Sequence, residues 1–269
     1  MKDLMIIRRE LSFRRNSIII FCAIVFVLVV LYTFIFPVIQ AQSAKFDQLI
    51  SSLGSVYKAI GIQGRVSFNN LDSYMSTELF GFTWPLLASL FSLILAGTTV
   101  AGEIESGTLG MLLALPISRG RIFLVKFLAG LVFLVVFVII STFSIIPLAE
   151  IIGVHFNITS YFLTALMATL FVISFFSLGL LVSATFSEKS HVYGVMGILL
   201  VVMYVANSLA NLISSLSWLK YSSFFHYFDA QTLLVNHQLD LSSIILFCSV
   251  SILSLISGAQ ILRKRDIVI

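Results

Sequence analysis

The sequence is poor in charge. Only 10% of its 269 residues are Asp, Glu, Lys or Arg, while 59% are hydrophobic. A soluble domain carries about 25% charged residues, so this chain cannot cover a water-exposed surface, and its apolar residues are expected to face lipid. The two cysteines, Cys22 and Cys248, both lie inside apolar runs, so a disulfide framework is not expected.

Catalytic and metal-binding motifs are scarce as well. The four histidines form no i, i+4 pair and no HExxH, which argues against a zinc site, and no GxSxG occurs. Gly97 to Gly102 matches the first six positions of the P-loop GxxxxGK[ST], but Glu103 stands where the phosphate-binding lysine belongs. We therefore expect no catalytic, cofactor-binding or metal site in this chain. The basic residues lie at the ends of apolar runs, which suits phospholipid headgroups and not nucleic acid.

Six apolar runs are long enough to cross a bilayer, which takes about 20 residues in a helix. We place the spans near 17–38, 79–100, 122–149, 161–186, 192–213 and 241–262. We see no internal repeat and no low-complexity linker. The expected fold is therefore all-α, a polytopic membrane protein with a single domain over residues 1–269.

The basic residues are distributed unevenly between the two sides of these spans. Twelve of the 16 Lys and Arg residues fall on the side that holds both termini and residues 101–121. Because basic residues concentrate in cytoplasmic connections, both termini and residues 101–121 are expected in the cytoplasm. The connections 39–78 and 214–240 are then extracellular, and the protein is expected in the cell (plasma or inner) membrane.

A basic leader precedes the first span, over residues 1–16. Leu4, Ile7 and Leu11 recur at helical spacing among charged residues. This pattern predicts a helix lying in the membrane interface, although a solvated basic leader fits it equally well. The charged residues assigned to this interfacial helix are Arg8, Arg9, Glu10 and Arg14.

Both outer connections contain apolar residues. Residues 44–60 have the spacing of an amphipathic helix that ends at Gly61. Residues 214–240 are rich in Trp, Tyr and Phe, which fits either an aromatic belt or short re-entrant helices.

The segment 101–121 carries charges of both signs on the expected cytoplasmic side. A short amphipathic helix is predicted to begin near Ser106 and to stop at Pro116. Ser118 is expected to cap the next helix, with the basic residues at its start in the headgroups. Such a segment fits either docking of a soluble protein or a plain re-entry of the chain into the membrane.

This segment resembles the signature that follows the second span in permeases of the type-2 ABC exporter superfamily, roughly GExExGTLxxLLxxPxSRxxIxxxK. The matching residues are Gly102, Glu103, Glu105, Gly107, Thr108, Leu109, Leu112, Leu113, Pro116, Ser118, Arg119, Ile122 and Lys126. Similarity to these permeases also extends to the leader IIRRELSFRR, the outer amphipathic helix, YMSTELF and SSFFHYFDA.

The resemblance implies an exporter half. Two permeases, identical or homologous, would pair in the lipid bilayer, and each would be driven by a separate cytoplasmic ABC ATPase subunit that binds ATP and Mg. The leader would be a connecting helix, and residues 214–240 part of an extracellular gate. The residues implied in coupling to the ATPase are Glu103, Glu105, Gly107, Thr108, Leu112, Pro116 and Arg119. Substrates across this superfamily range from ions to polysaccharides, so the cargo stays open.

Two other functions fit parts of the sequence. A permease-like scaffold could transmit ATPase motion to an extracellular partner without moving a solute, with the helix at 46–60 as its contact. An enzyme acting on lipids would need polar catalytic residues at the same depth in the membrane. The sequence offers no such pair at the ends of spans that face each other.

Overall fold

The computed structural model describes residues 9–10, 12, 14–42, 68–113 and 117–265. These residues form helices and connections, without a strand among them, and six helical units are long and apolar enough to cross a membrane. This result confirms the predicted all-α membrane fold. The units are α2 (Arg15–Ala41), Leu71–Glu105, Arg119–Ile151, α11 (Ile158–Thr185), α12 (Lys189–Leu212) and α15 (Leu241–Lys264).

The second unit is longer than predicted because it begins with a polar helix. It consists of α5 (Leu71–Glu78), the π-helix η1 (Leu79–Thr83), α6 (Trp84–Thr99) and α7 (Ala101–Glu105). The side chain of Asn70 accepts the backbone N–H of Ser73 at 2.7 Å and so caps the first turn of α5. Hydropathy alone missed α5 because most of its polar side chains are buried against neighbouring helices instead of facing lipid.

The third unit is broken near its end. α9 (Arg119–Phe143) stops at Ser144, and α10 (Ile145–Ile151) follows with Pro147 in its first turn. Proline has no N–H to donate to the carbonyl four residues earlier, and its ring crowds that carbonyl, so the helix cannot continue unchanged. At the break, the Ser144 hydroxyl donates to the Ile140 carbonyl at 2.6 Å.

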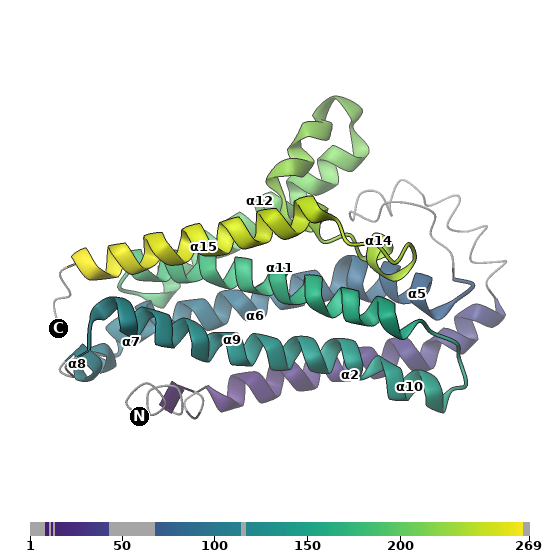
Figure 1. The fold of residues 1–269 in the computed structure, drawn as a ribbon, viewed down its shortest axis with the longest axis horizontal. Helices are drawn as coiled ribbons and strands as arrows, with labels where there is room; N and C mark the ends of the chain where they lie inside the picture. Colours follow the sequence, from purple (N-terminus) through teal and green to yellow (C-terminus); the bar gives the residue numbers. More distant parts are fainter. Residues whose placement is uncertain (1–8, 11, 13, 43–67, 114–116, 266–269) are drawn as a thin grey trace.

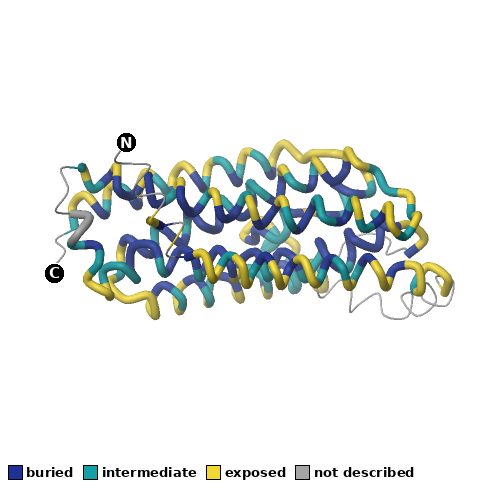
Figure 2. Tube along the Cα trace, turned by 90° about the horizontal axis from the view of Figure 1, so that it is seen from below, coloured by how far each residue is buried: buried dark blue, intermediate teal, exposed yellow. Residues whose placement is uncertain are grey.

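The core runs along the length of the bundle, and the buried sides of the helices face inward (Figure 2). Trp84 lies fully buried in the core, where its indole N–H donates to the Ser141 hydroxyl at 2.8 Å. α11 packs against α6, α9 and α15. α9 approaches α11 closely at Gly130, where a Cβ would lie only 2.2 Å from the ring of Phe176. Glycine is therefore needed at this crossing.

The two ends of the bundle differ (Figure 1). One end, called the α8 end, holds the start of α2, α7, the short helix α8 (Thr108–Leu113) and the last turn of α15. The other end, called the α14 end, holds α5, α10 and α14 (Ala230–Leu234). The first span thus begins at the α8 end and the last span ends there, as an even number of spans requires.

The aromatic connection after α12 forms short helices, one of the two forms predicted for it. These are the 3₁₀ helix η2 (Ser214–Ser222), α13 (Phe224–Tyr227) and α14. Figure 1 shows the last part of α12 and η2 projecting from one side of the bundle. The predicted helix at 44–60, with Gly61, lies outside the described residues.

Candidate functional site

A buried network of charges lies at the α8 end, and Lys126 of α9 is at its centre. Its Nζ lies 2.6 Å from Oε1 of Glu10 in the leader and 2.6 Å from Oε1 of Glu103 in α7. It also donates to the backbone carbonyl of Thr99 at 3.2 Å. The Lys126 side chain is 0% exposed, so three segments distant in the sequence meet at one buried ammonium group.

Arg14 extends this network from the leader to the end of α6. Its guanidinium lies 3.1 Å from Glu10 and donates to the Thr99 hydroxyl at 2.5 Å. It also donates to the backbone carbonyls of Leu95 at 3.2 Å and Thr98 at 2.8 Å. Because a guanidinium carries five N–H groups in a fixed plane, one side chain holds the leader against the last turn of α6.

Lys126 lies two turns into α9, beyond the basic first turn that was predicted to face the headgroups, and it is buried in the bundle. Burying an ammonium is costly unless anions and hydrogen-bond acceptors surround it, and here Glu10, Glu103 and a carbonyl do so. The leader and α7 are therefore each tied to α9 by an ion pair, and breaking either pair would leave a charge buried without its partner.

Glu105 points to a different part of the structure. Successive residues in a helix are rotated by about 100°, so Glu103 and Glu105 lie on nearly opposite sides of α7. Oε2 of Glu105 accepts the backbone N–H of Lys189 at 2.9 Å, and its Oε1 lies 3.5 Å from Nζ of Lys189. Lys189 begins α12, so α7 is connected to α9 through one carboxylate and to α12 through the other.

α7 and α8 are joined by a tight turn at Gly107. Its φ is +71°, in the left-handed region that favours glycine, and its N–H donates to the Ile104 carbonyl at 3.0 Å. α8 then begins at Thr108, and the fully buried Leu109 packs against Ile122 and Val125 of α9. A short helix is thus present where one was predicted, and its Leu109 rests on α9.

Arg119 joins α9 to the end of α15, because its guanidinium donates to the backbone carbonyl of Arg265. Arg265 in turn donates to the carbonyls of Ala184 and Phe186, each at 2.9 Å. Ser118 stands at the N-cap of α9 as predicted, but its side chain makes no capping hydrogen bond.

The structure thus brings together most of the residues singled out in the sequence. Glu10, Arg14 and Glu103 share one network, while Glu105, Gly107 and Thr108 lie on the adjoining surface. Arg9 is exposed next to them. Arg8, Pro116 and the side chain of Leu112 lie outside the described residues. No sequence signal marks Thr99 as a partner of Arg14, since a threonine inside an apolar span resembles many others.

The network around Lys126 should make the free energy of unfolding depend on pH in the acid range. Burial raises the pKa of the Glu10 carboxyl, but the charges of Lys126 and Arg14 outweigh burial, so this pKa is lowered from its ordinary value of 4.5. A lowered folded-state pKa stabilises the fold above pH 4.5, and this contribution is lost as the pH falls through the folded-state value. We expect the unfolding free energy of wild type to exceed that of Glu10→Gln by about 1–3 kcal/mol at pH 7, and this difference should shrink as the pH falls below 4.5 and through the folded-state pKa.

Denaturant unfolding of both proteins in the same detergent, at several pH values, measures this difference. A constant difference from pH 7 to pH 3 would show that the ionised form of Glu10 does not stabilise the fold.

Comparisons with known proteins identify the family of this chain. A search of curated proteins finds no match to the chain. The family model described as ABC-2 family transporter protein matches residues 4–262, which include the network around Lys126 and all of the six spans except the last two residues of α15. Since the match extends over nearly the whole chain, this protein belongs to the ABC-2 family of transporter membrane proteins.

Proposed function

We propose that this chain is the permease subunit of an ATP-driven ABC exporter, and that a separate cytoplasmic ATPase, with its bound ATP and Mg²⁺, pushes on α7 and α8. The observation that carries the proposal is the position of α7. Glu103 connects it to α9 and the leader, and Glu105 connects it to α12. A force applied to the exposed turn at Gly107 would therefore reach three other elements at once.

The space beside α7 supports such a movement. A cavity of about 300 Å³ lies next to it, lined by residues of the leader, α6, α7, α8 and α12. Arg9, Ser106 and Thr108 are among the residues that line it. Because packed protein interiors leave few such gaps, α7 has room to shift on this side without first compressing its neighbours.

The proposed arrangement in the cell follows from charge. The α8 end carries most of the basic residues, which favours a cytoplasmic α8 end in the cell membrane with both termini on that side. A second permease, identical or homologous, would complete the transporter within the bilayer, as the sequence resemblance implies. Alternating access would then result from two arrangements of the paired bundles, which the ATPases favour in turn.

Reversing the charge of Glu105 tests the docking surface. Its side chain is 38% exposed on α7, so an ATPase that contacts α7 meets this carboxylate directly. We expect Glu105→Arg to reduce the amount of ATPase that copurifies at least tenfold, about 1.4 kcal/mol of binding energy. The measurement is copurification of the tagged chain from membranes, followed by identification and quantification of the bound ATPase.

The matched control is Glu150→Arg, which makes the same change at an exposed glutamate in α10, at the α14 end. It should copurify ATPase as wild type does. Equal recovery with Glu105→Arg and wild type would exclude this surface as the docking site. Equal losses in both variants would attribute the effect to expression or membrane insertion.

A further inference from the structure

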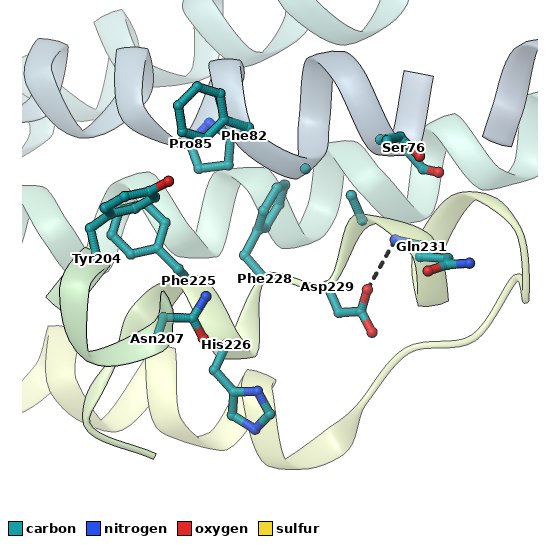
Figure 3. Close-up of a pocket in the computed structure, with 13 residues that line it drawn as sticks. Ser76, Phe82, Pro85, Tyr204, Asn207, Phe225, His226, Phe228, Asp229 and Gln231 are labelled. Atoms are coloured by element: carbon teal, nitrogen blue, oxygen red, sulfur yellow. Dashed lines mark hydrogen bonds between the residues drawn. The ribbon is translucent and has the colours of Figure 1, made fainter. Parts of the chain in front are cut away.

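A second cavity lies far from the α8 end, between α12, the segment from α13 to α14, and the continuous unit from α5 through η1 to the start of α6 (Figure 3). Its volume is about 50 Å³, whereas one water needs about 10–15 Å³, so it admits a group of several atoms. The residues that line it are Ser76, Thr77, Gly81, Phe82, Pro85, Tyr204, Asn207, Phe225, His226, Phe228, Asp229, Ala230 and Gln231.

Two polar side chains of this cavity lack a partner among the described residues. Asn207 is only 3% exposed, and its Oδ1 accepts no hydrogen bond. Nδ1 of His226 is buried and likewise has no partner. Since buried polar atoms are nearly always hydrogen-bonded, an acceptor such as Oδ1 of Asn207 is suited to a ligand that brings an N–H or O–H donor.

Aromatic rings form much of the wall. Tyr204 lies with its ring 5.9 Å from that of Phe82 and 5.7 Å from that of Phe225. On the other side, Phe228 stacks on Trp84 at 5.3 Å, and its ring stands between Phe225 and Asp229 in Figure 3. The faces of such rings attract cations and accommodate apolar groups.

One carboxylate, that of Asp229, is among the groups that line the cavity. Asp229 is exposed, and its carboxylate accepts two backbone N–H groups and the Thr232 hydroxyl without a cation paired to it in the described part of the chain. Lys220 lies over the ring of Tyr221, and its charge acts on His226 at the other side of the cavity wall. Burial and the charge of Lys220 lower the pKa of His226, so this imidazole is neutral at pH 7 and adds no positive charge.

The wall on the side of α6 has an unusual backbone. Gly81 and Phe82 belong to the π-helix η1, a conformation that is rare and often found at functional sites. The extra residue in the turn displaces Phe82 from the position it would have in a regular α-helix, and its ring then meets Tyr204.

We propose that this cavity binds a primary amine in its protonated form, attached to an aromatic or apolar group. The ammonium group donates to Oδ1 of Asn207 in the negative field of Asp229, and the apolar part lies among the rings of Phe82, Phe225 and Phe228. Transport of this amine as the solute would depend on the proposed permease function. Its binding to the cavity does not depend on that function.

The chain carries a reporter for this binding. It has two tryptophans, and Trp218 is 64% exposed on η2, whereas Trp84 stacks on Phe228 of the cavity. The variant Trp218→Phe leaves Trp84 as the sole source of tryptophan fluorescence. We expect 2-phenylethylammonium to change this emission in a saturable way, and 2-phenylethanol, which has the same shape without the charge, to bind at least tenfold more weakly.

Two variants in this background locate the site. Asn207→Leu removes the unpaired acceptor, and Asp229→Asn removes the charge but keeps a side chain that caps α14. Each should weaken binding of the amine at least tenfold. Asp240→Asn, at the N-cap of α15 and outside this cavity, removes the same charge at the same end and should leave binding unchanged.

Equal affinity for the amine and the alcohol would overturn the proposal. So would full binding by both Asn207→Leu and Asp229→Asn, or an equal loss with Asp240→Asn. The titration uses the full chain in detergent without ATPase or nucleotide. Absence of amine binding would therefore not contradict the proposal that an ATPase docks at α7. Likewise, absence of ATPase docking would not contradict amine binding.

Discussion

Replacing Lys126 by methionine should lower the free energy of unfolding by about 3–5 kcal/mol, the usual cost of removing one partner from a buried ion pair. Methionine fills much of the same volume, so packing changes little. The loss comes from Glu10 and Glu103, which would remain buried without the ammonium group that lies 2.6 Å from each. Denaturant unfolding in detergent measures the change.

A double variant separates electrostatics from packing. Adding Glu103→Gln to Lys126→Met removes the carboxylate that has lost its nearest cation, while Glu10 keeps Arg14 at 3.1 Å, so most of the lost stability should return. Lys220→Met makes the same substitution at a partly exposed lysine near the α14 end and should cost less than about 1 kcal/mol. A double variant no more stable than Lys126→Met would mean that the ion pairs do not hold this end together.

The spans could be predicted closely because lipid imposes a strict length. About 20 apolar residues are needed to cross the hydrocarbon, and most predicted boundaries fall within three residues of the observed helices. The largest difference is at the start of the second span, where α5 begins eight residues earlier, at Leu71. Its polar side chains are buried by other helices, and a scale built on transfer to lipid does not detect such burial.

The network around Lys126 could not be predicted in this way. A lysine two turns into a span fits two environments equally well, the headgroups and a buried ion pair. The choice depends on Glu10, which lies 116 positions earlier in the chain. The motif with Glu103 and Gly107 marked the right region, but only the three-dimensional arrangement separates Glu103, whose side chain is 15% exposed, from the more exposed Glu105.

The turn at Gly107 offers the sharpest test of force transmission. Proline requires φ near −65°, so Gly107→Pro cannot keep the observed +71° and also loses the N–H that bonds to Ile104. The turn should open and displace α8, while the spans, which pack elsewhere, stay folded. We expect ATP-dependent transport, or stimulation of ATP hydrolysis by the permease, to fall at least tenfold in vesicles containing the complete transporter.

Gly153→Pro is a closely matched control. Gly153 has φ of +69°, donates its N–H to the Glu150 carbonyl and, like Gly107, has open space within 4 Å of where a Cβ would lie. It lies after α10, at the α14 end. If the ATPase pushes at the α8 end, only Gly107→Pro uncouples transport although both variants suffer the same backbone change. Equal activity in the two variants would place the docking surface elsewhere, and the connections of α7 to α9 and α12 would then stabilise the bundle without transmitting force.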